Sequence, residues 1–454
     1  MNAKMKYIIP FFLLSIVFAC KESKENNTAY LGGKIINPKS DYIILFNHDK
    51  VLDSIKLNED HTFSGKFNNI KEGLYYFKHG PEHQYIYLEP NDSLLIRLNT
   101  WDFDESLVFS GSSANKNNIL INSFLDAEKK EQFFHNLHQL PPSKFKAKID
   151  SLKQVNLKQI EEFKINNPNV SNKFLEILNI SLIFPLYSEL ECYTVNYKPT
   201  INPINLPSFF KHRKSINMGL DSIMFFSTYS DYVIGKIYND VYQQGFQKDT
   251  DEFTVALLKA IDNNISSEKL KNTYLKHATV KYFYRKSSCD INKNSFYTFF
   301  KLNTSIKDKK EIQRLLNDAK QLRRKDSFPS FNVMNSNGDS LDIRKVIKGK
   351  KSAVYFRNTD HSLSNTVASR TNFLSKKVPG IQFVIINMIG NNDYYSRKMN
   401  TKEQYYLKDN SKAYQFLTSK YPRTVLVSEN GVIQNGFSSF NSMKILKQLQ
   451  ELEK

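Results

Sequence analysis

Residues 352–376, SAVYFRNTDHSLSNTVASRTNFLSK, join a short apolar run to a polar loop and a longer mixed segment. The run at 352–356 is largely apolar, which predicts a strand buried in the centre of an α/β sheet. The polar loop at 357–360 leads into a predicted helix at 361–376. A buried strand, a loop and a helix in this order are typical of an α/β domain.

The flanking sequence extends this unit in both directions. Before it, 328–331 and 335–341 predict a strand and a hairpin with its turn at Asn337-Gly338. After it come a predicted buried strand at 382–387, a helix at 411–419, a strand at 424–427, a turn at 429–431, a strand ending at 436 and a last helix from 442. This order of strands and helices is that of a thioredoxin fold.

Residues 326–454 resemble the TlpA-type thiol-disulfide oxidoreductases over the whole domain. In that family the central strand leads into Trp-Cys-x-x-Cys at the start of a helix, and a cis-proline faces this site from a distant loop. The strand and its approach match Val354, Tyr355, Phe356, Arg357, Asn358 and Thr359. Asp360 then takes the tryptophan position, His361 and Ser364 the two cysteine positions, and Ser362 and Leu363 the middle pair. Tyr421, Pro422 and Arg423 fall where the cis-proline loop belongs, and 426–431 match the strand that follows it.

The substituted site predicts a domain without dithiol chemistry. Disulfide exchange needs a thiolate at the helix N-terminus, where the helix dipole lowers its pKa, and a resolving thiol one turn later. His361 and Ser364 supply neither. The triad-like set of Asp360, His361, Ser362 and Ser364 comes from one turn, so its side chains diverge and helix capping explains it better than hydrolysis.

The cysteines outside residues 326–454 leave open the alternative of an active redox enzyme. The chain has 3, at Cys20, Cys192 and Cys289, and none forms a Cys-x-x-Cys pair. Cys192 and Cys289 could form a disulfide in an oxidising compartment or remain two buried thiols. An active oxidoreductase or isomerase would have to recruit one of them from another domain.

The N-terminal residues have the pattern of a targeting signal. Lys4 and Lys6 precede an apolar segment at 7–18. As a helix with a rise of roughly 1.5 Å per residue, about a dozen residues are too short to span a bilayer of about 30 Å. We therefore expect a signal peptide at 1–19. The ending Val17-Phe18-Ala19-Cys20 resembles a lipobox, which implies lipidation of Cys20 and a polar tether at 20–29; an ordinary secretory signal is the alternative. Lys21-Glu22 is a partial match to a surface-export signal of Bacteroidetes-type lipoproteins, and the membrane face stays open.

Two further regions precede the thioredoxin-like domain, which makes the expected fold class a multidomain α+β protein. Residues 30–118 predict a small antiparallel β-sandwich or barrel, of which we expect the sandwich. The alternation of apolar and polar residues marks strands at 31–36, 42–46, 51–57, 62–67, 73–78, 84–89 and 93–99. This region resembles a domain of unknown function that precedes thioredoxin domains in envelope proteins. Residues 119–325 predict a helical middle region with helices at 145–163, 172–190, 231–246, 252–261, 269–284 and 307–323.

Neither the net charge nor the histidines predict a further binding site. Lys+Arg number 64 against Asp+Glu 45, a net charge of +19, but the lysines are scattered and predict a solvated surface, not a nucleic-acid site. His135 and His138, with Glu131 one turn earlier, could ligate a metal on a helix, yet an exposed helix face is the simpler interpretation. No metal or other cofactor is expected.

These observations predict a lipid-anchored protein of the cell envelope, on the outer membrane, facing the periplasm or the outside. The family's groove beside Pro422 lies along an extended polypeptide, so we expect a peptide or envelope protein as partner. The alternatives are an active periplasmic oxidoreductase that uses Cys192 or Cys289, and a structural envelope component.

Overall fold

A computed structural model describes residues 27–48, 50–197, 208–288, 293–358, 364–388 and 404–454. The chain is a mixed α/β protein with several sheets. It divides into two compact units, one formed by 1–134 with 154–183 and the other by 135–153 with 184–454. The expected Cys20, Cys289, Asp360, His361, Ser362 and Leu363 lie outside the described residues.

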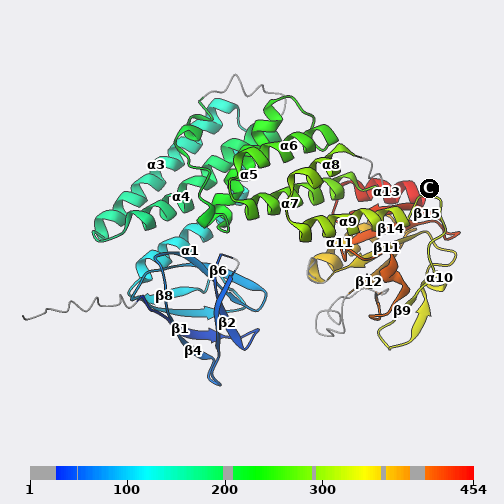
Figure 1. The fold of residues 1–454 in the computed structure, drawn as a ribbon, viewed down its shortest axis with the longest axis horizontal. Helices are drawn as coiled ribbons and strands as arrows, with labels where there is room; N and C mark the ends of the chain where they lie inside the picture. Colours follow the sequence, from blue (N-terminus) through cyan, green and yellow to red (C-terminus); the bar gives the residue numbers. More distant parts are fainter. Residues whose placement is uncertain (1–26, 49, 198–207, 289–292, 359–363, 389–403) are drawn as a thin grey trace, which may run out of the picture. The chain divides into compact units, whose positions relative to one another are not determined.

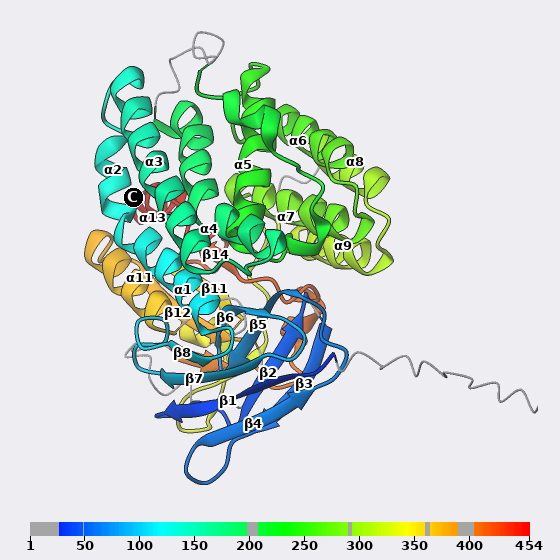
Figure 2. The same cartoon turned by 90° about the vertical axis from the view of Figure 1, so that its left-hand side faces the viewer.

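The first unit holds a β-sandwich of two four-stranded sheets. Its strands are β1 (Ala29–Ile36), β2 (Tyr42–Asn47), β3 (Lys50–Lys56), β4 (Thr62–Phe67), β5 (Gly73–His79), β6 (Glu82–Leu88), β7 (Ser93–Asn99) and β8 (Val108–Gly111). One sheet has the order β4-β1-β7-β8 and the other β3-β2-β5-β6 (Figure 2). The seven predicted strands are confirmed, and β8 is the strand that the sequence analysis missed.

The sandwich is not wholly antiparallel, which corrects one prediction. Strand β1 pairs antiparallel with β4 but parallel with β7, from Tyr30 opposite Ser93 to Ile36 opposite Asn99. Alternation along a strand tells which side chains face the core, but it is the same for both directions of pairing. Leu31, Ile35 and Leu94 are fully buried, but the direction of strand pairing is set by the tertiary structure.

Helices α1 (Ala114–Lys129), α2 (Glu131–Leu137), α3 (Pro142–Asn166) and α4 (Asn172–Cys192) follow the sandwich in the chain. The predicted helices at 145–163 and 172–190 are confirmed. In α1, Asn117 is buried and binds the backbone of β6: its side-chain oxygen accepts from the Tyr87 N–H at 2.7 Å, and its amide donates to the Tyr87 carbonyl at 2.9 Å. This amide ties the helix to the sheet that it covers.

The second unit continues with helices coloured green to yellow in Figure 1. They are α5 (Ser227–Gln243), α6 (Asp251–Asn264), α7 (Glu268–Lys286), α8 (Asn294–Leu302) and α9 (Ile306–Gln321). The side chains of Thr250, Ser267 and Ser305 cap α6, α7 and α9 by accepting a backbone N–H of the first turn. The four predictions in this region are confirmed, and α8 was missed.

The same unit ends in a seven-stranded sheet of order β10-β9-β13-β12-β11-β14-β15. Its elements are β9 (Asn332–Met334), β10 (Ser340–Asp342), α10 (Ile343–Val346), β11 (Ser352–Arg357), α11 (Ser364–Lys377), β12 (Gln382–Asn387), β13 (Gln404–Tyr406), β14 (Arg423–Val427), β15 (Ile433–Ser438) and α13 (Lys444–Glu453). Strand β11 is buried along its length, parallel to β12 and antiparallel to β14, so the predicted central strand is confirmed.

Helices α11 and α13 cover one face of this sheet, where Tyr355, Leu374 and Leu449 share a core. The other face packs Val354, Phe356 and Phe331 into a second core with the segments before β10 and before β14. Alternate residues of β11 thus serve two cores, which is why residues 353–356 are hydrophobic on both faces of the strand. The predicted helix at 411–419 is only a 3-10 turn at Lys412–Gln415, because Asp318 of α9 binds the backbone of Thr418 and Ser419.

Candidate functional site

The segment before Pro422 is held by one carboxylate of helix α9. Asp318 is 1 % exposed. One of its oxygens accepts from the Thr418 N–H at 3.0 Å and the Thr418 hydroxyl at 2.7 Å, and the other from the Ser419 N–H at 2.9 Å and hydroxyl at 2.6 Å. A carboxylate that takes four hydrogen bonds fixes the backbone it faces, so α9 sets the path of the chain into the proline loop. We use "proline loop" for residues 418–422.

Tyr421 of the proline loop is bound to the same helix. Its hydroxyl donates to a carboxylate oxygen of Glu311 at 2.5 Å. Burial and the nearby Glu311 carboxylate raise the pKa of Tyr421, so the phenol keeps its proton and remains a donor. Glu311 also accepts from the Lys276 ammonium of α7 at 3.1 Å, which connects both helices to the loop.

Pro422 is held from the side of helix α7. The Tyr284 hydroxyl donates to the Pro422 carbonyl oxygen at 2.9 Å, and the Tyr284 ring meets the Tyr421 ring edge-on with centroids 6.4 Å apart. The resemblance implies a cis-proline here, but no cis peptide bond occurs among the described residues, so the Tyr421–Pro422 bond is trans. An amide before proline favours trans by about 0.5–1 kcal/mol, and the helices α7 and α9 hold the loop in that form.

A cavity of about 460 Å³ lies beside this loop. Helix α7 forms one wall with Lys276, His277, Val280 and Tyr284; the other wall consists of Tyr355, Tyr421, Pro422 and the segment Ser439, Phe440 and Asn441 after β15. The cavity therefore combines aromatic and aliphatic surface with a Lys–Glu pair at its edge. Its volume falls within the range of about 300–1,000 Å³ that is usual for ligand pockets.

The residues around the degenerate site positions are described up to Asn358 and again from Ser364. Arg357 ends β11 and is 1 % exposed; its guanidinium donates to the Asn387 side chain at 3.2 Å, and burial lowers its pKa. The Asn358 amide donates to the Lys420 carbonyl at 3.0 Å, which ties the approach loop to the proline loop. Arg423 is also buried and donates to the Phe416 carbonyl. Ser364 is the first residue of α11.

Cys192 is a poor candidate for a redox thiol. It ends α4, far in sequence from the thioredoxin-like domain, and is half-buried with its sulfur unbridged. Burial, with smaller contributions from Glu189, Glu191 and Asp231, raises the pKa of the Cys192 thiol to about 11. Because the thiolate is the nucleophile in disulfide exchange, this environment suppresses reactivity at neutral pH.

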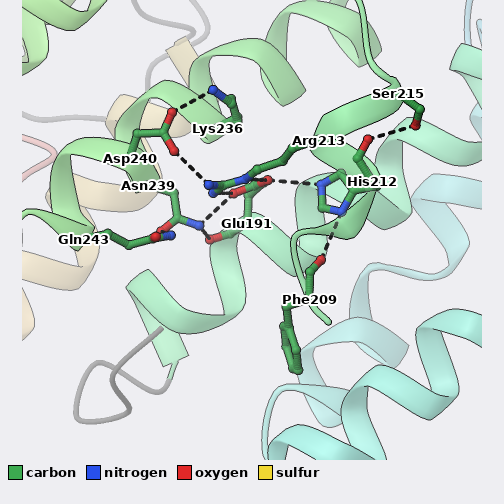
Figure 3. A network of polar contacts seen from close by, with 9 residues as sticks. All are labelled: Glu191, Phe209, His212, Arg213, Ser215, Lys236, Asn239, Asp240 and Gln243. Atoms are coloured by element: carbon green, nitrogen blue, oxygen red, sulfur yellow. Dashed lines mark hydrogen bonds and ion pairs between the residues drawn. The ribbon is translucent and has the colours of Figure 1, made fainter. Parts of the chain in front are cut away.

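Next to Cys192, a buried polar network escaped the sequence analysis (Figure 3). Glu191 is enclosed by three donors: Arg213 binds both of its oxygens, His212 binds one at 3.1 Å, and the Asn239 amide donates at 2.7 Å. Burial opposes the charge, but the hydrogen bonds from Arg213 and His212 keep the pKa of Glu191 below its ordinary value. Arg213 also donates to Asp240 at 2.8 Å. The network locks the 3-10 helix Lys211–Ser215 onto α4 and α5.

His135 and His138, the pair considered as metal ligands, lie in different surroundings. His138 is buried, not exposed as expected, and bonds the Glu189 carboxylate at 2.5 Å; His135 is exposed. Within the described ranges, no three or more His, Cys, Asp or Glu side chains are grouped so that they could hold a metal ion. Among the helices that the structure describes, none is both long and apolar enough to cross a membrane.

Comparison with known proteins returned solved structures only. No protein-family model matches the chain, and no curated protein matches it. The thioredoxin domain of a thiol-disulfide oxidoreductase from Bacteroides vulgatus is 15 % identical and covers 29 % of this chain and 99 % of its own, with a TM-score of 0.25. A thiol:disulfide interchange protein from Bacteroides sp. is 18 % identical, with coverages of 27 % and 90 % and a TM-score of 0.21. A thiol peroxidase from Chromobacterium violaceum is 15 % identical, with coverages of 29 % and 88 % and a TM-score of 0.24.

Proposed function

We propose that this chain is a membrane-tethered lipoprotein of the bacterial cell envelope whose thioredoxin-like domain is redox-inactive and binds a segment of a peptide or protein partner. The observation that carries the proposal is the cavity of about 460 Å³ between helix α7 and the proline loop. It lies in a domain whose sequence from 326 to 454 contains no cysteine. A pocket can bind without a thiol, whereas disulfide exchange cannot proceed without one.

The hydrogen bonds of the proline loop favour insertion of partner side chains over addition of a strand. An added strand needs free main-chain N–H and C=O groups. Here the N–H groups of Thr418, Ser419 and Tyr421 and the carbonyls of Lys420 and Pro422 already have partners in the chain. The partner segment would therefore be recognised by its side chains, packed against the tyrosine rings and close to the Lys276–Glu311 pair.

A photo-crosslinking amino acid at Asn441, at the open edge of the cavity, tests partner binding in the tethered full chain. The expected result is one defined crosslinked polypeptide in native envelopes, identified by mass spectrometry, and none from the same amino acid at Ile306, which is 70 % exposed on α9. Asn441→Trp, which fills the cavity mouth, should abolish co-purification of that polypeptide with the unfolding midpoint unchanged. Equal crosslinking at both positions would refute the cavity as the binding site.

Tethering and redox inactivity have separate tests. Cys20→Ser should move the protein from the membrane to the soluble envelope fraction, since a lipid anchor on that sulfur would be lost. The full chain should fail to reduce insulin, and the Cys192→Ser, Cys289→Ser double variant should not differ from it. Insulin reduction that disappears in the double variant would establish the oxidoreductase alternative instead.

A further inference from the structure

A second cavity, of about 450 Å³, lies within the helices of the second unit and belongs to neither the proline loop nor the degenerate site positions. It is a groove between α5, α6 and α7, and we call it the helix groove. Ile234 of α5, Leu257 and Ile261 of α6, and Ala278 of α7 supply its apolar lining. Pockets of this size with mostly apolar walls and a few polar groups are typical of sites for small ligands.

Two opposite charges lie on the rim of the helix groove. They are Asp231 of α5 and Lys281 of α7, both exposed. Neither has a hydrogen bond or an ion pair with another described residue. Loss of hydration against the groove raises the pKa of Asp231 and lowers the pKa of Lys281. Each charge would therefore gain from a counter-charge supplied by a ligand.

A further pair of opposite charges in the helix groove is already matched. Arg285 of α7 binds Asp249 and lies 3.5 Å from the Tyr238 hydroxyl. His277 is exposed at the wall that α7 shares with the first cavity. Asp231 and Lys281 are thus the opposite charges on the rim that remain for the two ends of a ligand.

The spacing of these charges sets the length of the ligand. Asp231 and Tyr274 line the same groove, and burial raises the pKa of Tyr274 with a contribution from the Asp231 charge, so the two residues are near each other. Lys281 follows Tyr274 by seven residues on α7, which is about 10 Å along a helix at roughly 1.5 Å per residue. An extended peptide spans about 3.3–3.6 Å per residue, so roughly three residues bridge that distance.

We propose that the helix groove binds a short apolar peptide of about three residues with both termini free, its α-ammonium at Asp231 and its α-carboxylate at Lys281. An acyl-chain carboxylate would satisfy Lys281 but leave Asp231 without a counter-charge, so it fits the groove less completely. The helix groove shares His277, Val280 and Tyr284 of α7 with the wall of the proposed partner site, but Asp231 and Lys281 line the helix groove alone.

Calorimetric titration of the full chain with trileucine, N-acetyl-trileucine, trileucine amide and dodecanoate tests the proposal. Trileucine should bind, and blocking either terminus should weaken binding roughly tenfold, because each block removes one charge-assisted hydrogen bond. Asp231→Asn should remove the preference for the free amine alone, and Lys281→Gln the preference for the free carboxylate alone. Lys259→Gln, at an exposed lysine of α6 outside the groove, should change neither.

Three results would overturn the proposal. They are no trileucine binding by folded protein at millimolar concentration, equal binding of free and blocked peptides, and tighter binding of dodecanoate than of trileucine. Asn441→Trp, which closes the partner site, should leave trileucine binding unchanged. The two proposals can therefore fail separately.

Discussion

The Tyr284 hydroxyl donates a hydrogen bond to the Pro422 carbonyl at 2.9 Å, although the two residues are 138 positions apart. The bond joins a helix of the middle region to the proline loop. Together with Asp318 and Glu311 of α9 it makes helices and sheet one packed body within the second unit. The seven-stranded sheet is thus a docked part of this unit and not a free module.

Tyr284→Phe should loosen this docking without disturbing the packing of the ring. The Pro422 carbonyl loses its donor, and we expect the free energy of unfolding to fall by about 1 kcal/mol, the usual value for one hydrogen bond. Denaturant unfolding measures the loss, and hydrogen exchange at residues 418–421 should speed up. Tyr297→Phe, at a tyrosine of α8 that is 68 % exposed, is the control and should have no effect. Equal stability and exchange in both variants would contradict a role for the Tyr284 hydroxyl.

Asp318→Asn should destabilise the second unit more strongly. One carboxylate oxygen becomes an NH₂ group that faces N–H and hydroxyl donors of the loop, so two charge-assisted hydrogen bonds are lost and a buried donor is left unsatisfied. We expect a loss of about 3 kcal/mol in the free energy of unfolding, seen as a lower denaturant midpoint with an unchanged slope. Asp409→Asn, at an exposed aspartate before the same loop, should stay within about 0.5 kcal/mol of the parent. A loss of similar size in both would show that α9 does not hold the loop through this carboxylate.

The Glu191 network should make the free energy of unfolding depend on pH in the acidic range. The folded-state pKa of Glu191 lies below its ordinary value of 4.5, so its contribution is present above about pH 4.5 and is lost as the pH falls through the folded pKa. Unfolding midpoints between pH 3 and pH 7 should therefore drop on the acid side in the parent, and less steeply in Glu191→Gln. Glu252→Gln, at an exposed glutamate, should retain the parent profile. Identical acid profiles for all three proteins would mean that the network does not titrate with folding.

Cys192 should be slow to alkylate in the folded protein. A pKa of about 11, against an ordinary value of 9.0, reduces the thiolate fraction roughly hundredfold at neutral pH. Peptide-resolved mass spectrometry after iodoacetamide treatment should find Cys192 largely unmodified at pH 7 and fully modified once the chain is unfolded in urea. Rapid native alkylation would indicate an activated thiol and would reopen the oxidoreductase alternative.

The local elements followed from residue patterns, because each is encoded within about a dozen neighbouring residues. Alternation predicted the sandwich strands to within a few residues, as at 62–67 and 93–99, and helical spacing predicted α3 and α4. The absence of cysteine from residues 326–454 is likewise a property of the sequence alone. Short elements with weak patterns, such as β8 and α8, were missed.

The sequence alone therefore determined most of the elements, their order and the absence of a Cys-x-x-Cys pair. Tertiary structure decided the parallel pairing of β1 with β7, the trans bond before Pro422, the burial of His138 and the enclosure of Glu191. These features depend on partners far away in the chain, as when Asp318 meets Thr418 100 residues later. A local sequence pattern does not encode which distant side chain will contact a given residue. That contact forms only when the hydrophobic cores pack and the buried polar groups must be hydrogen-bonded.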